Sequence, residues 1–280
     1  MARIKKGLLS LSIVLVLGAC SAAEEEEETD EVWEDISEKG EIVVGTPGTL
    51  YPASYYPDDS DELTGYDVEV MREVGDRLDL EVTFEELDFD SMFGSLQSGR
   101  IDVAPAGLRK EMKDKFAYSE PYKYSYATMI VREDDVDSFE SLEDLDGKIA
   151  GGAATTVYSE IAEKFGAEVK TYGNVTNDIY LEDVENGRTD VVINDYYLQL
   201  LALDALPDLD VTIHPDLKFH PTDQRAIVDK DAHTLKDKID ETLDDMKEDG
   251  TLTEISEEFF GGEDVSEEPD EDIEEIEGIE

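Results

Sequence analysis

Short apolar runs alternate with amphipathic segments through the first half of the chain. The runs are typical of buried β-strands, while the amphipathic segments carry an apolar residue every three or four positions, as an α-helix does. In the first helical segment Val68, Met71, Val74 and Leu78 share one face. The pattern predicts a βαβαβ unit with strands at 41–46, 80–87 and 100–107 and helices at 66–78 and 89–99.

The same alternation returns after the turn sequence DLDG at 144–147. Strands that alternate with helices form parallel sheets covered on both faces. We therefore expect an α/β protein of two lobes, each a mainly parallel sheet flanked by helices. The second set has strands at 148–152, 168–172 and 190–194 and helices at 156–166 and 176–187.

Two further segments can connect the lobes. The segment 124–134 leads from the first unit to the second, and 219–231 precedes two final helices at 235–250 and 252–262. If these helices pack on the first lobe, the chain crosses twice and the crossings form a hinge, with the ligand at the carboxyl ends of the strands. The predicted lobes are 36–127 plus 223–262 and 128–222.

The charge of the chain excludes some partners. It holds 23 Lys+Arg and 74 Asp+Glu, a formal net charge of −51. Phosphates would be repelled, so nucleic acid is excluded as a partner, and electrostatic docking on anionic lipid is disfavoured. Because salt screens such repulsion, an acidic surface suggests a secreted protein of a salt-loving organism.

Both ends of the chain predict segments outside the lobes. Residues 1–19 have a basic start and a short apolar run, which is typical of a secretory signal peptide. The following Cys20, the sole cysteine, lies in LGAC, which resembles the bacterial lipobox; lipidation there is favoured over a free buried thiol. Residues 20–35 and 263–280 are acidic and poor in aromatic residues, so we expect a tether and a disordered tail.

At this point the chain resembles the bacterial extracellular solute-binding proteins of family 3, over about residues 36–265. The motifs that carry the resemblance are GEIVVGT, LTGYDVEV, SLQSGRIDV, FAYSEPY, SLEDLDGK, NGRTDVVINDY and MKEDGTLTEISEEFFG. It implies the two-lobe periplasmic-binding-protein fold of type II and delivery of a polar amino acid to the permease of an ABC importer. GYDVEVMREVG, EKFGAEV and ISEEFFGGEDVS look most like the cystine-binding branch.

The resemblance gives Asp195 a role. Family members hold the ligand's α-ammonium on an Asp that follows the NGR.D turn, and counting from Gly187 reaches Asp195. The residues alone allow a plainer interpretation, because an Asp ahead of a helix caps free backbone N–H groups. Both roles can coexist.

The family's carboxylate-binding Arg falls on Met112 here, and methionine cannot bind a carboxylate. Arg109 is the candidate replacement, because residues three apart on a helical turn share a face; the alternative is a solvated surface arginine. Gly107, at the start of this shortened segment, is a further predicted ligand-binding position.

The remaining predicted contacts also come from the resemblance. Thr155 and Thr156 match the family's pair at a helix start, although Thr is also a common helix cap. Tyr51 is expected to stack on the ligand, with Tyr55 sharing that role, and Phe89 lies where the cystine-binding branch has a tryptophan. Buried aromatic residues are, however, more often core than ligand contacts.

We expect a monomeric, lipid-anchored binding protein on the extracytoplasmic face of the cell membrane. No enzymatic role, cofactor or metal is predicted, because the three histidines lack metal-like spacing and no phosphate-binding loop is present. Two alternatives stay open: an enzyme resembling the cyclohexadienyl dehydratases that share this fold, and a sensory protein that presents its ligand to a receptor.

Overall fold

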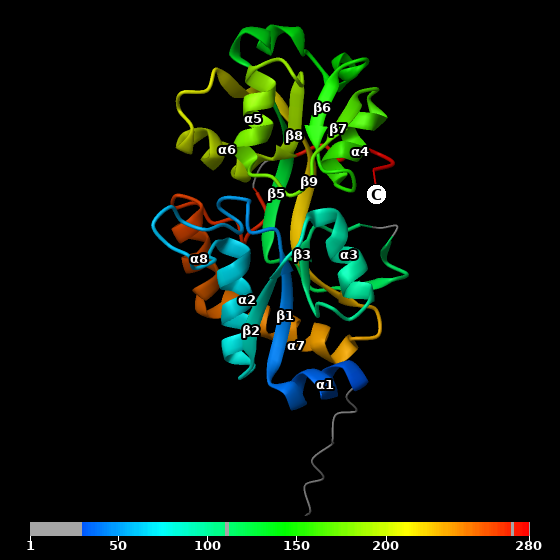
Figure 1. The fold of residues 1–280 in the computed structure, drawn as a ribbon, viewed down its shortest axis with the longest axis vertical. Helices are drawn as coiled ribbons and strands as arrows, with labels where there is room; N and C mark the ends of the chain where they lie inside the picture. Colours follow the sequence, from blue (N-terminus) through cyan, green and yellow to red (C-terminus); the bar gives the residue numbers. More distant parts are fainter. Residues whose placement is uncertain (1–29, 110–111, 270–271, 280) are drawn as a thin grey trace, which may run out of the picture.

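Two α/β lobes lie one above the other, joined by the long strands β5 and β9 (Figure 1). The computed structural model describes residues 30–109, 112–269 and 272–279. The fold is the predicted one: mixed α/β, with two lobes and two crossings between them.

The first lobe is built around β1 and β2, which pair in parallel. An isolated parallel bridge between Val44 and Val103 joins β1 to the segment that leads into β3. The elements of this lobe are α1 Glu31–Lys39, β1 Glu41–Thr46, α2 Tyr66–Arg77, β2 Glu81–Glu86, α3 Phe89–Gln97, β3 Ala104–Ala106, β4 Phe116–Tyr118, α7 His233–Asp249 and α8 Thr251–Phe259.

The second lobe is built around β6, which pairs in parallel with β7 and β8. Helices flank these strands, and two short 3-10 helices connect them to β5 (Figure 1). Its elements are η2 Glu133–Ser138, η3 Leu142–Leu145, β6 Ile149–Gly152, α4 Val157–Lys164, β7 Glu168–Thr171, α5 Asn177–Glu185, β8 Val191–Asp195 and α6 Tyr196–Ala205.

The two crossings are β5 Lys123–Arg132 and β9 Val211–Asp229. They pair with each other in antiparallel fashion from Lys123 opposite Gln224 to Arg132 opposite Val211. One end of β9 also pairs with β3 and β4 of the first lobe, while β5 pairs with β8 of the second. The hinge is therefore a two-stranded ribbon that continues the sheets of both lobes.

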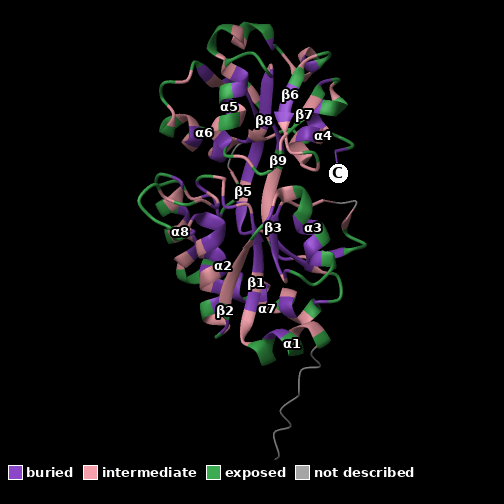
Figure 2. Cartoon of the chain, in the orientation of Figure 1, coloured by how far each residue is buried: buried purple, intermediate pink, exposed green. Residues whose placement is uncertain are grey.

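The final helices pack on the first lobe. Leu235 and Ile239 of α7 and Leu252 of α8 belong to the same buried cluster as Val44 and Met71. Each is at most 2% exposed. Figure 2 shows β5 and β8 mostly buried, β2 and β9 largely at intermediate exposure, and the outer faces of the helices exposed, as expected for amphipathic helices.

The predicted tether ends earlier than expected. Helix α1 begins at Glu31, because Asp30 caps it by accepting a hydrogen bond from the Trp33 backbone N–H at 2.9 Å. Asp30 also accepts from the Thr234 N–H at 2.7 Å, which attaches α1 to the start of α7. The predicted signal peptide and Cys20 lie outside the described residues.

The tail prediction is also corrected by the structure. In the described parts of 263–280, Val265 and Ser266 are each 1% exposed and Ile279 is 2% exposed. Val265 packs into the core of the first lobe, whereas Ile276 and Ile279 pack against the core of the second. Burial of these side chains helps to hold the segments on the protein, because it removes apolar surface from water.

No helix in the described part of the chain combines the length and the apolar character needed to cross a membrane.

Candidate functional site

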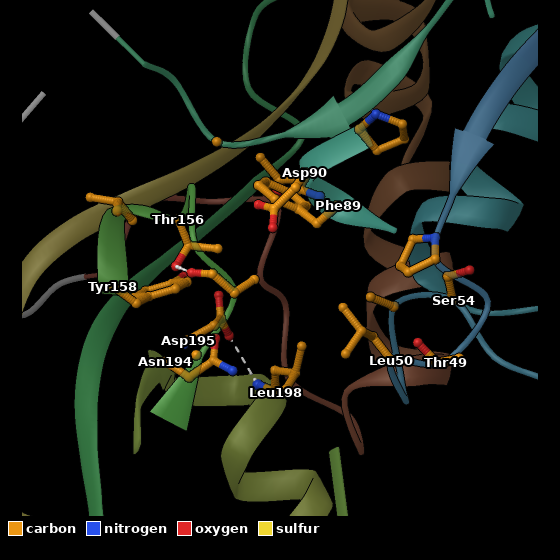
Figure 3. Close-up of a pocket in the computed structure, with 18 of the residues that line it drawn as sticks. Thr49, Leu50, Ser54, Phe89, Asp90, Thr156, Tyr158, Asn194, Asp195 and Leu198 are labelled. Atoms are coloured by element: carbon orange, nitrogen blue, oxygen red, sulfur yellow. Dashed lines mark hydrogen bonds between the residues drawn. The ribbon is translucent and has the colours of Figure 1, made fainter. Parts of the chain in front are cut away.

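A cavity of about 210 Å³ lies between the lobes. The loop after β1, the start of α3 and the segment after β3 line it from the first lobe. The start of α4 and the ends of β7 and β8 line it from the second, and residues of the crossing strands complete it. Figure 3 shows Asp195 and Thr156 on one side and Leu50 and Ser54 on the other. The carboxyl ends of β1 and β8 face this space, where an α/β protein binds its ligand.

The lobes are closed over the cavity by direct hydrogen bonds. Thr155 donates to Asp90 Oδ1 from its backbone N–H at 3.1 Å and from its hydroxyl at 2.6 Å. On another side, Thr49 donates to the Asn174 side chain at 2.8 Å, and Asn174 donates to the Pro47 carbonyl at 2.9 Å. These contacts join residues of different lobes, so an opening rotation must break them.

Asp195 is the last residue of β8 and the N-cap of α6. Its Oδ1 accepts a hydrogen bond from the Leu198 backbone N–H at 2.9 Å, which is the predicted helix cap. Its Oδ2 forms an ion pair with the Lys123 ammonium. Asp195 is 6% exposed and lines the cavity. A carboxylate in so enclosed a place requires a cation, and Lys123 supplies one.

A second buried carboxylate, Asp67 of α2, lines the same cavity. Its oxygens accept hydrogen bonds from the Tyr122 hydroxyl at 3.1 Å and from Gln224 Nε2 at 3.0 Å. The pKa of Asp67 is raised from 3.8 to about 6, mainly because burial disfavours the charged form; Lys123 and the two hydrogen bonds lower it, and the charge on Asp195 adds a smaller rise.

Arg109 and Gly107 both line the cavity, whereas Met112 does not. Met112 packs instead against a buried apolar cluster of the first lobe. The Arg109 side chain is 14% exposed, and its Nη2 lies 3.9 Å from Glu160 Oε2 of the other lobe. Gly107 approaches the crossing strand closely, since a Cβ there would lie 3.1 Å from the Asp223 carbonyl oxygen. The arginine is therefore at the interface of the lobes rather than on the outer surface.

The two predicted threonines separate. Thr156 lines the cavity and caps α4, accepting a hydrogen bond from the Ser159 backbone N–H at 3.2 Å. Thr155 is outside the lining and bonds to Asp90 across the closed cleft. Thr156 thus both caps α4 and lines the cavity, while Thr155 contributes to closure of the lobes.

The predicted aromatic wall is rearranged. Phe89, the first residue of α3, lines the cavity. Tyr51 and Tyr55 do not; their rings contact each other with centroids 4.8 Å apart, and Tyr51 is 38% exposed. The second lobe instead provides aromatic lining residues that sequence reasoning missed, namely Tyr158, Tyr172 and Tyr180.

Lys123 and Asp67 were also missed by sequence reasoning. An Asp in the first turn of a helix is expected from its interaction with the helix dipole, and Asp67 fits that pattern. Lys123 stands at the start of a long apolar strand. The signal that could have pointed to Lys123 is a charged residue in a strand that is otherwise nearly all buried, because lysine is rarely buried without a partner.

The fold and the cavity together define a class: a two-lobed protein that closes around a small ligand and carries charged groups of both signs in the enclosed space. The comparisons with known proteins agree. The family model for bacterial extracellular solute-binding proteins, family 3, matches residues 42–262. The chain belongs to that family.

The relatives of this chain include two proteins of Bacillus subtilis (strain 168). The probable ABC transporter extracellular-binding protein YckB is 50% identical over 271 residues, which cover 95% of this chain and 94% of YckB. The L-cystine-binding protein TcyA is 35% identical over 271 residues, 94% of this chain and 99% of TcyA. The crystal structure of YckB matches with a TM-score of 0.71 and 51% identity, covering 88% of this chain and 99% of that one. The resemblance found in the motifs, the type II fold and the substrate-binding role are thereby confirmed.

Proposed function

We propose that this protein captures a polar amino acid between its lobes and delivers it to the permease of an ABC importer, with L-cystine as the favoured ligand. The observation that carries the proposal is the placement of Asp195 and Arg109 in one closed cavity between lobes. An α-amino acid carries an ammonium and a carboxylate, and this pair of side chains offers a partner for each. The cystine preference is supported by TcyA, which is named for that ligand.

The residue roles follow from this chemistry. Asp195 receives the α-ammonium and Arg109 the α-carboxylate. Thr156 and the N-terminus of α4 add donors for the carboxylate, because backbone N–H groups at a helix start attract anions. Phe89 supplies apolar contact, and Gly107 keeps the backbone close to the ligand.

Closure couples binding to transport. Asp195 belongs to the second lobe and Arg109 to the first, so a ligand held by both stabilises only the closed form. The hydrogen bonds of Thr155 to Asp90 and of Asn174 to Pro47 then hold the cleft shut. The closed form is the one that docks on the permease.

A thermal-shift screen tests this function. The chain without residues 1–20 is heated in molar salt with each protein amino acid, with L-cystine and with small dicarboxylates. Mass action raises the melting temperature for a tight ligand. We expect a shift with L-cystine or another polar amino acid, and loss of that shift in the Asp195→Asn variant. The absence of any shift among the amino acids would refute the function.

We also propose that Cys20 carries the lipid that keeps the protein at the membrane. Its position at the end of an apolar signal supports this. Serine offers no thiol for acylation, so Cys20→Ser is expected to move the protein out of the membrane fraction after signal removal. Retention of that variant in the membrane would refute the anchor. We propose no catalytic activity, because both relatives described above are named as binding proteins.

A further inference from the structure

The Lys123 ammonium forms an ion pair with Asp195, the carboxylate that is proposed to bind the ligand's ammonium. Lys123 is the first residue of β5, and Asp195 is the last of β8, the strand that pairs with β5. In the ion pair, the side chains of Lys123 and Asp195 are 11% and 9% exposed. Both residues line the cavity. An incoming ammonium therefore meets a resident one.

A second carboxylate, Asp67, offers Lys123 an alternative partner. Asp67 lies close enough for the Lys123 charge to lower its pKa, and its current partners, Tyr122 and Gln224, are neutral. The cluster of Asp67, Lys123 and Asp195 holds two carboxylates and one ammonium. With both acids ionised it carries one net negative charge, and a buried unpaired charge is costly, so the cluster has the capacity for one further cation.

We propose that Lys123 is a specificity-determining residue that holds Asp195 before binding and shifts toward Asp67 when a ligand ammonium takes its place. This inference rests on the proposed function. It implies that a ligand must bring its own cation to open the site, because a ligand without one leaves the Lys123–Asp195 pair intact. It also implies that the resident ammonium lowers the affinity that Asp195 would otherwise give.

The decisive variant is Lys123→Met, which keeps the length of the side chain and removes its charge. Calorimetric titration with L-cystine, or with the best amino acid from the screen, is expected to show at least tenfold tighter binding than the wild type. Lys236→Met is the matched control, because it also breaks an ion pair, with Asp240 on α7, but outside the cavity lining. It is expected to bind as the wild type does.

A double-mutant cycle separates competition from other effects. In the Asp195→Asn background, which is expected to have lost binding, Lys123→Met is expected not to restore it, since the contested carboxylate is gone. Without the lysine, repulsion between Asp67 and Asp195 can prevent folding of Lys123→Met. In that case the Lys123→Met/Asp67→Asn variant is used, because it keeps Asp195 as the one charge of the cluster. That variant is expected to show the same gain.

The outcomes are distinguishable from failure of the proposed function. No binding of any amino acid by the wild type contradicts the function itself. Binding that Asp195→Asn abolishes, together with unchanged affinity in Lys123→Met, contradicts only the displacement of Lys123. Weaker binding in Lys123→Met also contradicts it, because the lysine would then be a direct contact of the ligand.

Discussion

Asp67 should make the stability of this protein depend on pH in a direction opposite to that of most acids. Its folded-state pKa is about 6, compared with 3.8 for an ordinary Asp, mainly because burial disfavours the charged form. The folded protein therefore binds this proton more tightly than the unfolded chain. The stabilising contribution is fully present below the unfolded pKa and is lost as the pH rises through the folded one.

The size of the effect follows from the two pKa values. A shift from 3.8 to about 6 corresponds to about 3 kcal/mol over the whole titration, at about 1.4 kcal/mol per pH unit. The sequence pI is about 4.1, so measurements near pH 4 would meet the point of minimum solubility. Between pH 5 and pH 7.5 the contribution of Asp67 should fall by about 1.4 kcal/mol.

Urea unfolding of the wild type and of Asp67→Asn at pH 5 and pH 7.5, in constant molar salt, measures this contribution. Asn does not titrate, and the altered hydrogen bonds with Tyr122 and Gln224 affect both pH values alike. Asp67→Asn should therefore gain about 1.4 kcal/mol relative to the wild type on going to pH 7.5. The exposed control Asp59→Asn should keep the wild-type pH dependence. Equal pH dependence in the wild type and Asp67→Asn would refute the raised pKa of this buried carboxylate.

Three further predictions follow from the site, the tail and the charge. Arg109→Gln should weaken binding of the amino acid by about 2 to 5 kcal/mol in calorimetric titration. Unchanged affinity would contradict the proposed contact between Arg109 and the ligand's carboxylate. Ile279→Ala should lower the free energy of unfolding by about 2 kcal/mol, whereas the exposed Glu277→Gln control should change it little. If Ile279→Ala has no effect, the packing of the tail on the second lobe is contradicted. The melting temperature should rise from low to molar sodium chloride, because salt screens the net charge of −51, and a flat or falling profile would contradict that repulsion.

The sequence by itself determined the order of the elements. The helices α2 and α3 and the strands β1 and β8 lie within a few residues of their predicted positions, because their periodicity depends on residues close in the chain. The order of the elements also determined the two crossings. The cap formed by Asp195 is local in the same sense, since its partner is the Leu198 N–H, three residues along.

Only the tertiary structure decided what else Asp195 contacts. Lys123 is separated from it by 72 residues, and Asp67 of α2 comes from the other lobe. Their meeting depends on how β5 pairs with β8 and on how the lobes close, and strand pairing is set by long-range packing rather than by local pattern. The tail illustrates the same limit. Composition predicts disorder for an acidic segment, but Val265 and Ile279 are buried because each finds an apolar site on a different lobe, and such a site exists only once the chain has folded.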